Sequence, residues 1–136
     1  MIKYTTSLES VSEDMLAGGF FVGWPNPPSP AAHIRILNGS YTVWMAIDTD
    51  KNTVAGFINA ISDGVMSAYI PLLEVLPDYQ GNGIGGELVR RMIESLKHLY
   101  MVDVLCDEAL QAYYNKFGMA NATGVYLRNY DKQNCG

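Results

Sequence analysis

The segment Gln80-Gly81-Asn82-Gly83-Ile84-Gly85-Gly86 lies between two regions of different periodicity. Residues 65–76 form an apolar stretch of strand character before it, followed by the turn Pro77-Asp78-Tyr79. After it, residues 84–96 place their apolar side chains on one helical face. Four glycines in six residues cost too much conformational entropy for a simple tight turn. Because glycines bring backbone N–H groups close to a ligand and helix N-termini attract anions, we predict a cradle for a diphosphate group.

The remaining periodicity predicts one α/β domain over residues 1–136, in which helices pack on a mixed sheet. Residues 41–76 contain three consecutive strand patterns joined by tight turns, which indicates an antiparallel meander. Helices are expected after Ser12, from Pro30 to Gly39, over residues 84–96 and over residues 108–117. Strands are expected at residues 2–6, 41–47, 53–61, 65–76, 101–106 and 123–130.

The composition is that of a folded globular protein and disfavours several partners. With 49% hydrophobic and 17% charged residues the chain can form a core, and a net charge of −5 disfavours nucleic acid or an anionic membrane. Its two histidines and two cysteines are isolated, so we expect no metal site and no disulfide framework. No apolar segment is long enough to span a bilayer or to form a signal core, so a cytoplasmic location is expected. The sequence leaves a homodimer open.

Two classes of diphosphate ligand compete for the glycine-rich loop. Residues 81–86 satisfy the G-x-G-x-x-G fingerprint of nicotinamide dinucleotide-binding folds, and Asp107 lies at the distance expected of a ribose-binding acid. Three features count against that interpretation. Residues 77–80 separate the strand from the glycines, the preceding strands form hairpins, and only 29 residues follow Asp107, too few for the rest of a doubly wound sheet.

The alternative pattern is Q-x-x-G-x-G, which Gln80, Gly83 and Gly85 satisfy at a strand-to-helix turn. A second motif, Ala112-Tyr113-Tyr114-Asn115-Lys116-Phe117-Gly118-Met119, follows on the next predicted helix. Together these motifs resemble the two signatures of the GNAT acyltransferase superfamily, over residues 72–119 in motif and over most of the chain in order of elements.

This resemblance implies a twisted, mostly antiparallel central sheet with about four helices, in which the fourth and fifth strands splay apart. It also implies acetyl-CoA as the acyl donor. Backbone groups of Leu73 and Val75 would bind the pantetheine arm in the manner of an added strand, and a backbone N–H near Val75 would polarise the thioester carbonyl. The pyrophosphate would be held by Gln80, Gly81, Asn82, Gly83, Ile84, Gly85 and Gly86.

Two residues are candidates for proton transfer. Tyr114 matches the family tyrosine that protonates the departing thiolate, and a phenol and a thiol have pKa values close enough for that step. Packing in the core is the alternative role for Tyr114. Glu74 is the one acid within its strand and could act as the base; pairing with a cation or a water chain are the alternatives. The carboxylate that some family members carry near the position of Tyr69 is absent, and Asn82 stands where the family often has a cation.

The acceptor is expected near the N-terminal helices, where Phe21 and Trp24 precede a proline-rich run. These rings could form a lip for an amine by cation–π contact, or they could simply cover the sheet; a docking segment for another protein is a third option. The predicted function is therefore an acetyl-CoA-dependent N-acetyltransferase that acts on a primary amine, by direct transfer in a ternary complex. A non-catalytic acyl-CoA-binding module and a nicotinamide dinucleotide-binding domain are the alternatives.

Overall fold

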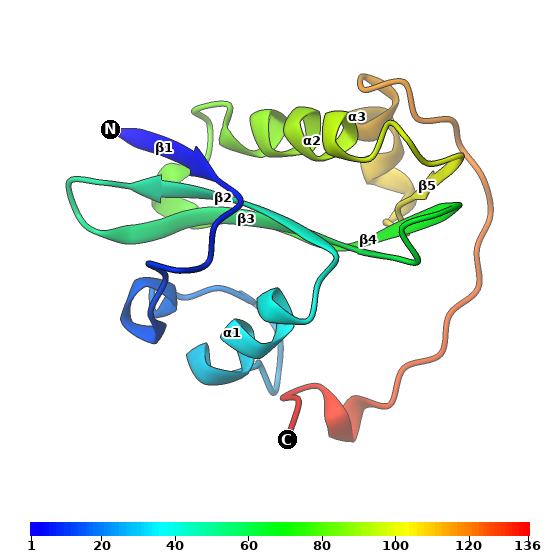
Figure 1. Cartoon of the computed structure of the whole chain (residues 1–136). Helices are drawn as coiled ribbons and strands as arrows, with labels where there is room; N and C mark the ends of the chain where they lie inside the picture. Colours follow the sequence, from blue (N-terminus) through cyan, green and yellow to red (C-terminus); the bar gives the residue numbers. More distant parts are fainter.

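A computed structural model covers residues 1–136 and contains a five-stranded sheet in the order β1-β2-β3-β4-β5. The strand pairs are antiparallel except for the last, β4 with β5, which is parallel. Helices α2 and α3 lie on one face of the sheet and α1 lies on the other (Figure 1). The strands are β1 (Ile2–Thr5), β2 (Thr42–Asp48), β3 (Thr53–Ser62), β4 (Ser67–Val75) and β5 (Met101–Asp103), and the α-helices are α1 (Pro30–Asn38), α2 (Ile84–Ser95) and α3 (Gln111–Asn115). Four single-turn 3-10 helices complete the list: η1 (Glu13–Leu16), η2 (Pro77–Tyr79), η3 (Glu108–Leu110) and η4 (Tyr130–Lys132).

The two last strands separate soon after they meet. β5 pairs with β4 only over three residues, from Ser67 opposite Met101 to Tyr69 opposite Asp103. Beyond Tyr69 the strand β4 continues to Val75, paired with β3 alone. The register between β3 and β4 shifts at Asn59/Ile61, opposite Pro71, a residue that has no backbone N–H to donate to a ladder. The splayed fourth and fifth strands that the resemblance implies are therefore confirmed.

Apolar side chains fill both faces of the sheet. On the upper face of Figure 1 the predicted stripe of α2 is buried against β2, β3 and β4, and it includes Ile84, Leu88, Val89 and Met92. On the lower face η1, the turn that follows it and α1 enclose a second cluster around Phe57. The helix α1 begins as predicted, because the Ser29 side chain accepts a hydrogen bond from the Ala32 N–H and Pro30 occupies the first position.

Four predicted elements differ from the structure. The strand expected over residues 101–106 ends at Asp103. Residues 123–130 form no strand: the chain there is exposed, runs outside the sheet (Figure 1) and pairs with none of its five strands. The helix expected after Ser12 is the single turn η1, since Gly18 and Gly19 follow its C-cap residue Ala17. The helix expected over residues 108–117 is divided into η3 and the short α3, so three α-helices are present where about four were expected.

His33 in α1 is a titratable group inside the lower core. Its ring is 1% exposed and packs against Phe20, Phe21 and Phe57, at centroid distances of 5.3, 5.1 and 4.4 Å. Its Nε2 atom has no hydrogen-bond partner. Burial therefore lowers the pKa of His33 from 6.5 to about 4.

This pKa predicts a loss of stability in mild acid. The unfolded chain binds the proton near pH 6.5 and the folded chain only near pH 4, so the free energy of unfolding falls as the pH is lowered through that window. The contribution of His33 to the loss is roughly 3 kcal/mol by linkage. Urea unfolding at pH 7 and pH 4.5 measures it, with His33→Phe as the control that keeps a ring without a titration. An equal loss in both proteins would contradict the prediction.

Candidate active site

The glycine-rich loop presents a row of backbone N–H groups that have no acceptor. The first helical bond of α2 runs from the Glu87 N–H to the Gly83 carbonyl at 3.1 Å, and none of the six N–H groups of residues 81–86 donates a hydrogen bond. Gly81 and Gly83 have φ values of +82° and +79°, a conformation that other residues rarely adopt. A Cβ at either position would meet no atom within 4 Å, so the space beside the loop is open. Unpaired N–H groups at the start of a helix are donors of the kind that can bind diphosphate oxygens.

Side chains of the glycine-rich loop hold its conformation through hydrogen bonds and core packing. The Gln80 side-chain amide donates to the Val75 carbonyl at 3.0 Å, and the Asn82 side-chain amide donates to the Tyr79 carbonyl at 3.1 Å. Ile84 is 4% exposed and belongs to the upper core. These three residues thus hold the backbone in shape. The N–H groups of Asn82 and Ile84 stay free, while the Gln80 N–H donates to the Pro77 carbonyl at 3.3 Å.

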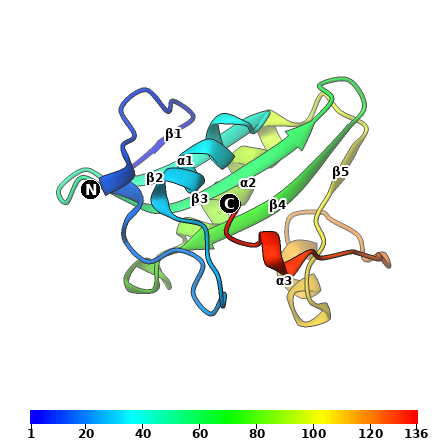
Figure 2. The same ribbon diagram turned by 90° about the horizontal axis from the view of Figure 1, so that it is seen from below.

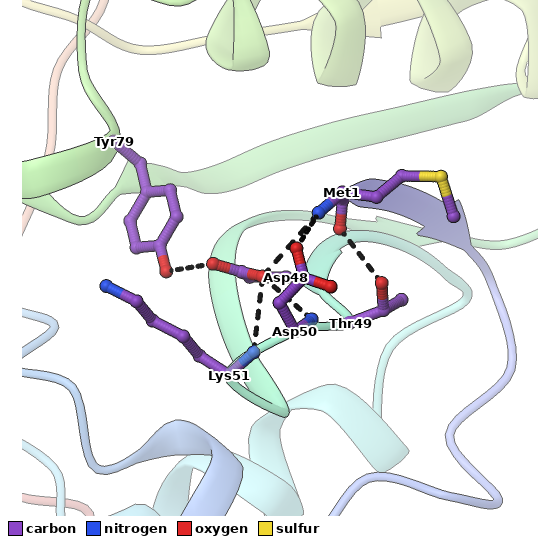
Figure 3. A network of polar contacts seen from close by, with 6 residues as sticks. All are labelled: Met1, Asp48, Thr49, Asp50, Lys51 and Tyr79. Carbon is purple, nitrogen blue, oxygen red and sulfur yellow. Dashed lines mark hydrogen bonds and ion pairs between the residues drawn. The ribbon is translucent and has the colours of Figure 1, made fainter.

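A polar network fixes the turn that precedes the loop (Figure 3). The Tyr79 hydroxyl donates to Asp48 Oδ2 at 2.6 Å, at the end of β2. Asp48 also accepts from the N–H groups of Asp50 and Lys51 at 3.0 and 3.3 Å, and the Met1 ammonium lies 3.9 Å from it. The hydrogen bond from Tyr79, with the two backbone donors, lowers the pKa of Asp48, and the same bond raises the pKa of Tyr79 to about 12. Sequence reasoning missed this pair, because its members lie 31 residues apart.

Tyr79→Phe should therefore make η2, the turn that precedes the glycine-rich loop, more mobile. Without the hydroxyl donor we expect the pKa of Asp48 to move up toward its ordinary value, because the largest cause of its lowering is removed. We also expect binding of acetyl-CoA to weaken severalfold, since η2 is no longer tied to β2. An NMR titration of the Asp48 carboxyl carbon and a binding isotherm measure the two effects. An unchanged Asp48 pKa would contradict the assigned network.

The open half of β4 exposes backbone groups next to the loop. The Leu76 N–H bonds the Ala55 carbonyl at 2.8 Å, and Glu74 lies opposite Phe57. In an antiparallel pair, residues that hydrogen-bond to the partner strand alternate with residues whose N–H and C=O groups point away from it. Glu74 and Leu76 belong to the first kind. Leu73 and Val75 belong to the second kind, so their backbone groups face the gap left by β5. The Val75 carbonyl is the acceptor for Gln80, which leaves its N–H free.

Glu74 lies on the opposite face of β4 from Leu73 and Val75. Its carboxylate accepts a hydrogen bond of 2.7 Å from the Phe21 N–H. Burial raises the pKa of Glu74, and the bond from Phe21 opposes the shift. Phe21 has a φ of +66°, which is rare for a residue with a side chain, so the carboxylate stabilises an unusual turn.

The two residues predicted to contact the acceptor lie together on the lower face. The rings of Phe21 and Trp24 are 4.9 Å apart; Phe21 is 4% exposed and Trp24 is 37% exposed. Phe21 is therefore part of the core, and only Trp24 presents a surface to a ligand. A cavity of about 130 Å³ is lined by Phe21, with Phe20, Pro28 and His33, and Trp24 is not part of its lining.

Tyr114 packs on the same upper cluster as Leu73 and Val75, so the structure places it on the side of the β4 gap that faces α2. Its hydroxyl makes no hydrogen bond, and its ring meets Tyr113 edge-on at 5.2 Å. Burial, with smaller contributions from Cys106 and Tyr113, raises the pKa of Tyr114 to about 12. At neutral pH the Tyr114 hydroxyl is therefore protonated, and its proton is not used in a hydrogen bond.

Arg90 is a candidate site residue that neither sequence motif includes. A Cβ on Gly86 would be 3.5 Å from Arg90 Nη2, and the guanidinium lies 5.6 Å from the centroid of Phe117. Arg90 thus brings a guanidinium to the first turn of α2, where its Nη1 atom also lies 3.7 Å from Glu87 Oε1. The signal that could have found it is its spacing of four residues from Gly86 on one helical face.

The structure contains no group of three or more histidine, cysteine or acidic residues arranged to hold a metal ion. It also contains no helix that is long and apolar enough to cross a membrane.

The chain is similar to a known protein family and to solved structures. The family model described as "Acetyltransferase (GNAT) family" matches residues 11–119. A crystal structure from Deinococcus radiodurans R1, described as a candidate acetyltransferase, is 44% identical, with a TM-score of 0.92 over 97% of this chain and 91% of that one. A GNAT family acetyltransferase from Streptococcus pneumoniae TIGR4 is 28% identical, with a TM-score of 0.75 over 95% and 98% of the two chains.

A curated relative is similar at lower coverage. The uncharacterised N-acetyltransferase ycf52 of Pyropia yezoensis is 27% identical over 100 residues, which are 71% of this chain and 58% of the relative. The chain thus spans little more than half the length of that relative.

Proposed function

This chain belongs to the acetyltransferase (GNAT) family, and on that premise we propose that it is an acetyl-CoA-dependent N-acetyltransferase. The acceptor is a primary amine of a small molecule or peptide, and transfer is direct, within a ternary complex. The observation that carries the proposal is the row of six unpaired N–H groups over residues 81–86, which opens beside the free edge of β4.

The described residues fit the two parts of the coenzyme that they would hold. The N–H groups of the loop and the Arg90 guanidinium match the charge of a diphosphate. The free backbone groups of Leu73 and Val75 match the amides of a pantetheine arm, which pairs with them as a short strand would. When bound, acetyl-CoA supplies an activated thioester.

Three groups of the chain would then carry the reaction. The Val75 N–H would donate a hydrogen bond to the thioester oxygen, where negative charge would develop. The Tyr114 hydroxyl, kept protonated by a pKa of about 12, would give its proton to the departing thiolate. Glu74, whose pKa is raised by burial, takes the proton of the amine directly or through water. The proline-rich turn with Trp24 borders the path of the acceptor, and the net charge of −5 favours a cationic amine.

A non-catalytic acyl-CoA-binding module is the second candidate. Two observations favour it: the Tyr114 hydroxyl contacts no polar group, and the Glu74 carboxylate already holds the Phe21 turn. Such a module would need the loop and the β4 edge but neither of these side chains. A nicotinamide dinucleotide domain is not retained, because the antiparallel order of β1 to β4 is not that of a doubly wound sheet.

A thiol-release assay tests the proposal. Purified protein is incubated with acetyl-CoA and a panel of primary amines, including polyamines, amino sugars and peptides with a free N-terminus or lysine. We expect turnover above the uncatalysed rate with at least one cationic amine. Binding of acetyl-CoA without turnover on any amine would leave only the binding module. A cytoplasmic location is part of this proposal and is tested separately, by fractionation of expressing cells.

A further inference from the structure

The cavity of about 130 Å³ on the lower face of the sheet has a single polar side chain in its lining, that of His33. This face carries α1, which lies over β2 and β3 (Figure 2) and contains His33 in its first half. We propose that the cavity binds the body of the acceptor amine and selects an uncharged, ring-sized group with one hydroxyl or N–H, which His33 hydrogen-bonds. The inference rests on the proposed transferase function, because it names the class of amine that the site selects.

His33 is a buried polar group whose hydrogen bonding the chain leaves incomplete. The residue is 1% exposed, and its Nε2 atom has no partner. Buried polar groups in folded proteins nearly always have a partner, either in the protein or in a bound molecule. An ordered water is a poor partner here, because buried waters need two to four polar neighbours and the side chains of this cavity offer one. The free ring nitrogen therefore indicates a ligand that brings its own hydrogen-bonding group.

The size and the walls of the cavity fit one compact apolar group. Apart from His33 the lining has only apolar side chains and a glycine, and it includes Leu16, Phe20, Phe21 and Pro28. An apolar cavity of roughly 150 Å³ can hold one benzene molecule, so a space of about 130 Å³ fits a ring or a short branched chain. Apolar walls favour such a group because it leaves water when it binds.

Neighbouring rings hold the imidazole in one orientation. Phe20 and Phe57 meet it edge-on, with centroid distances of 5.3 and 4.4 Å, and Phe21 lies tilted at 5.1 Å. Pro30, which precedes His33 in α1 and also lines the cavity, has a fixed φ. The hydrogen-bonding group is thus in place before a ligand arrives, which lowers the entropic cost of binding.

The cavity excludes a second charge on the acceptor. None of the lining residues is charged at neutral pH, since burial lowers the pKa of His33 to about 4. A charged body would lose its hydration there and find no opposite charge. A neutral imidazole has one donor and one acceptor, so that a hydroxyl or an N–H can bond to it. Polyamines, phosphorylated sugars and amino acids with a charged side chain are therefore expected to be poor acceptors.

The cavity adjoins the carboxylate proposed to receive the proton of the amine. Phe21 connects the two, because it lines the cavity and its N–H donates to Glu74 at 2.7 Å. Glu74 is also the cross-strand partner of Phe57, so their side chains share a face, and the Phe57 ring packs on His33. Glu74 and His33 thus have two neighbours in common. An amine bound at Glu74 can therefore extend its body into the cavity.

Two amines that differ in one group test the subsite. The bodies of 4-hydroxybenzylamine and 4-methylbenzylamine have the same size, and only the first can hydrogen-bond His33. We expect kcat/KM to be at least about tenfold higher for the hydroxyl compound, because a site that bonds a hydroxyl rejects an analogue without it. In His33→Phe the ratio should fall to one or below, since a purely apolar cavity gains nothing from the hydroxyl.

His98→Phe is the matched control. His98 is the second histidine of the chain; its Nε2 lies 3.2 Å from the Tyr41 hydroxyl, and it is not part of the cavity lining. This variant should keep the wild-type ratio. A further variant, His33→Gln, keeps a donor and an acceptor and should retain part of the preference. Circular dichroism checks that each variant is folded.

A binding measurement separates this inference from the proposed function. Phenol is titrated into the wild-type chain with ¹⁵N-labelled histidine and without acetyl-CoA. We expect a saturable shift of the His33 ring nitrogens, which the spectrum of His98→Phe identifies, and a smaller shift with toluene. Equal kcat/KM for the two amines in the wild type, or unshifted His33 nitrogens with phenol, would overturn the inference. If no amine is turned over, the proposed function fails, and the phenol titration still decides whether the cavity is a ligand site.

Discussion

Replacing Tyr114 by Phe is expected to lower kcat by on the order of 100-fold, while the affinity for acetyl-CoA changes little. The hydroxyl makes no hydrogen bond in the structure, so its removal breaks no contact and the fold should be retained. The ring keeps its place beside Tyr113 on the upper core. Only the proton that the thiolate needs is lost.

The adjacent tyrosine provides the control. Tyr113 lies on the same helix, but its hydroxyl lies toward the first turn of α2, 3.3 Å from where a Cβ on Gly85 would stand. Tyr113→Phe should therefore alter the affinity for the coenzyme at most and leave kcat unchanged. Steady-state kinetics of both variants with the best amine of the panel separate the two roles. If Tyr114→Phe kept the kcat of the wild type, Tyr114 would be a core residue only.

The second large effect is expected at the glycine loop, where Gly83→Ala should weaken acetyl-CoA binding at least about tenfold. Gly83 has a φ of +79°, and an alanine there either moves the loop or carries a methyl group into the open cradle. Either change displaces the row of N–H groups, each worth roughly 1.5–3 kcal/mol when it bonds a charged oxygen.

Gly23 offers a matched control for backbone strain. Its φ is +85° and a Cβ there would also meet no atom within 4 Å, but it lies in the turn before the proline-rich run. Both alanine variants should lose a similar 1–2 kcal/mol of stability, about the cost of the left-handed conformation. Only Gly83→Ala should lose coenzyme affinity. Equal affinity in the two variants would remove residues 81–86 from the coenzyme site.

Local pattern was enough to predict the part of the fold that carries the loop. The meander of β2, β3 and β4, the helix α2 and the turn between them are dictated by alternation, by helical spacing and by glycine. The splay of β4 and β5 was inferred only from the resemblance, since no pattern in residues 70–75 indicates that one side of this strand is unpaired. Residues 123–130 were predicted as a strand from propensity, but propensity does not decide whether a segment pairs with a neighbouring strand.

Long-range contacts account for the site features that sequence could not supply. The bond between Tyr79 and Asp48 and the bond between Phe21 and Glu74 join residues far apart in the chain, and no local pattern marks them. Phe21 was predicted at the acceptor site, yet its ring is 4% exposed and belongs to the lower core. Arg90 was visible as a polar residue of α2, but its relation to Gly86 depends on the side-chain direction.

The central claim is that the N–H groups of residues 81–86 hold the diphosphate of coenzyme A. A ¹H–¹⁵N NMR titration observes these groups directly, because the glycine amides resonate apart from most others. We predict that acetyl-CoA shifts the resonances of Gly81, Gly83, Gly85 and Gly86 at saturating concentration, and that NAD leaves them in place. Saturable binding of acetyl-CoA without a shift of these four resonances, or a shift with NAD alone, would contradict the claim.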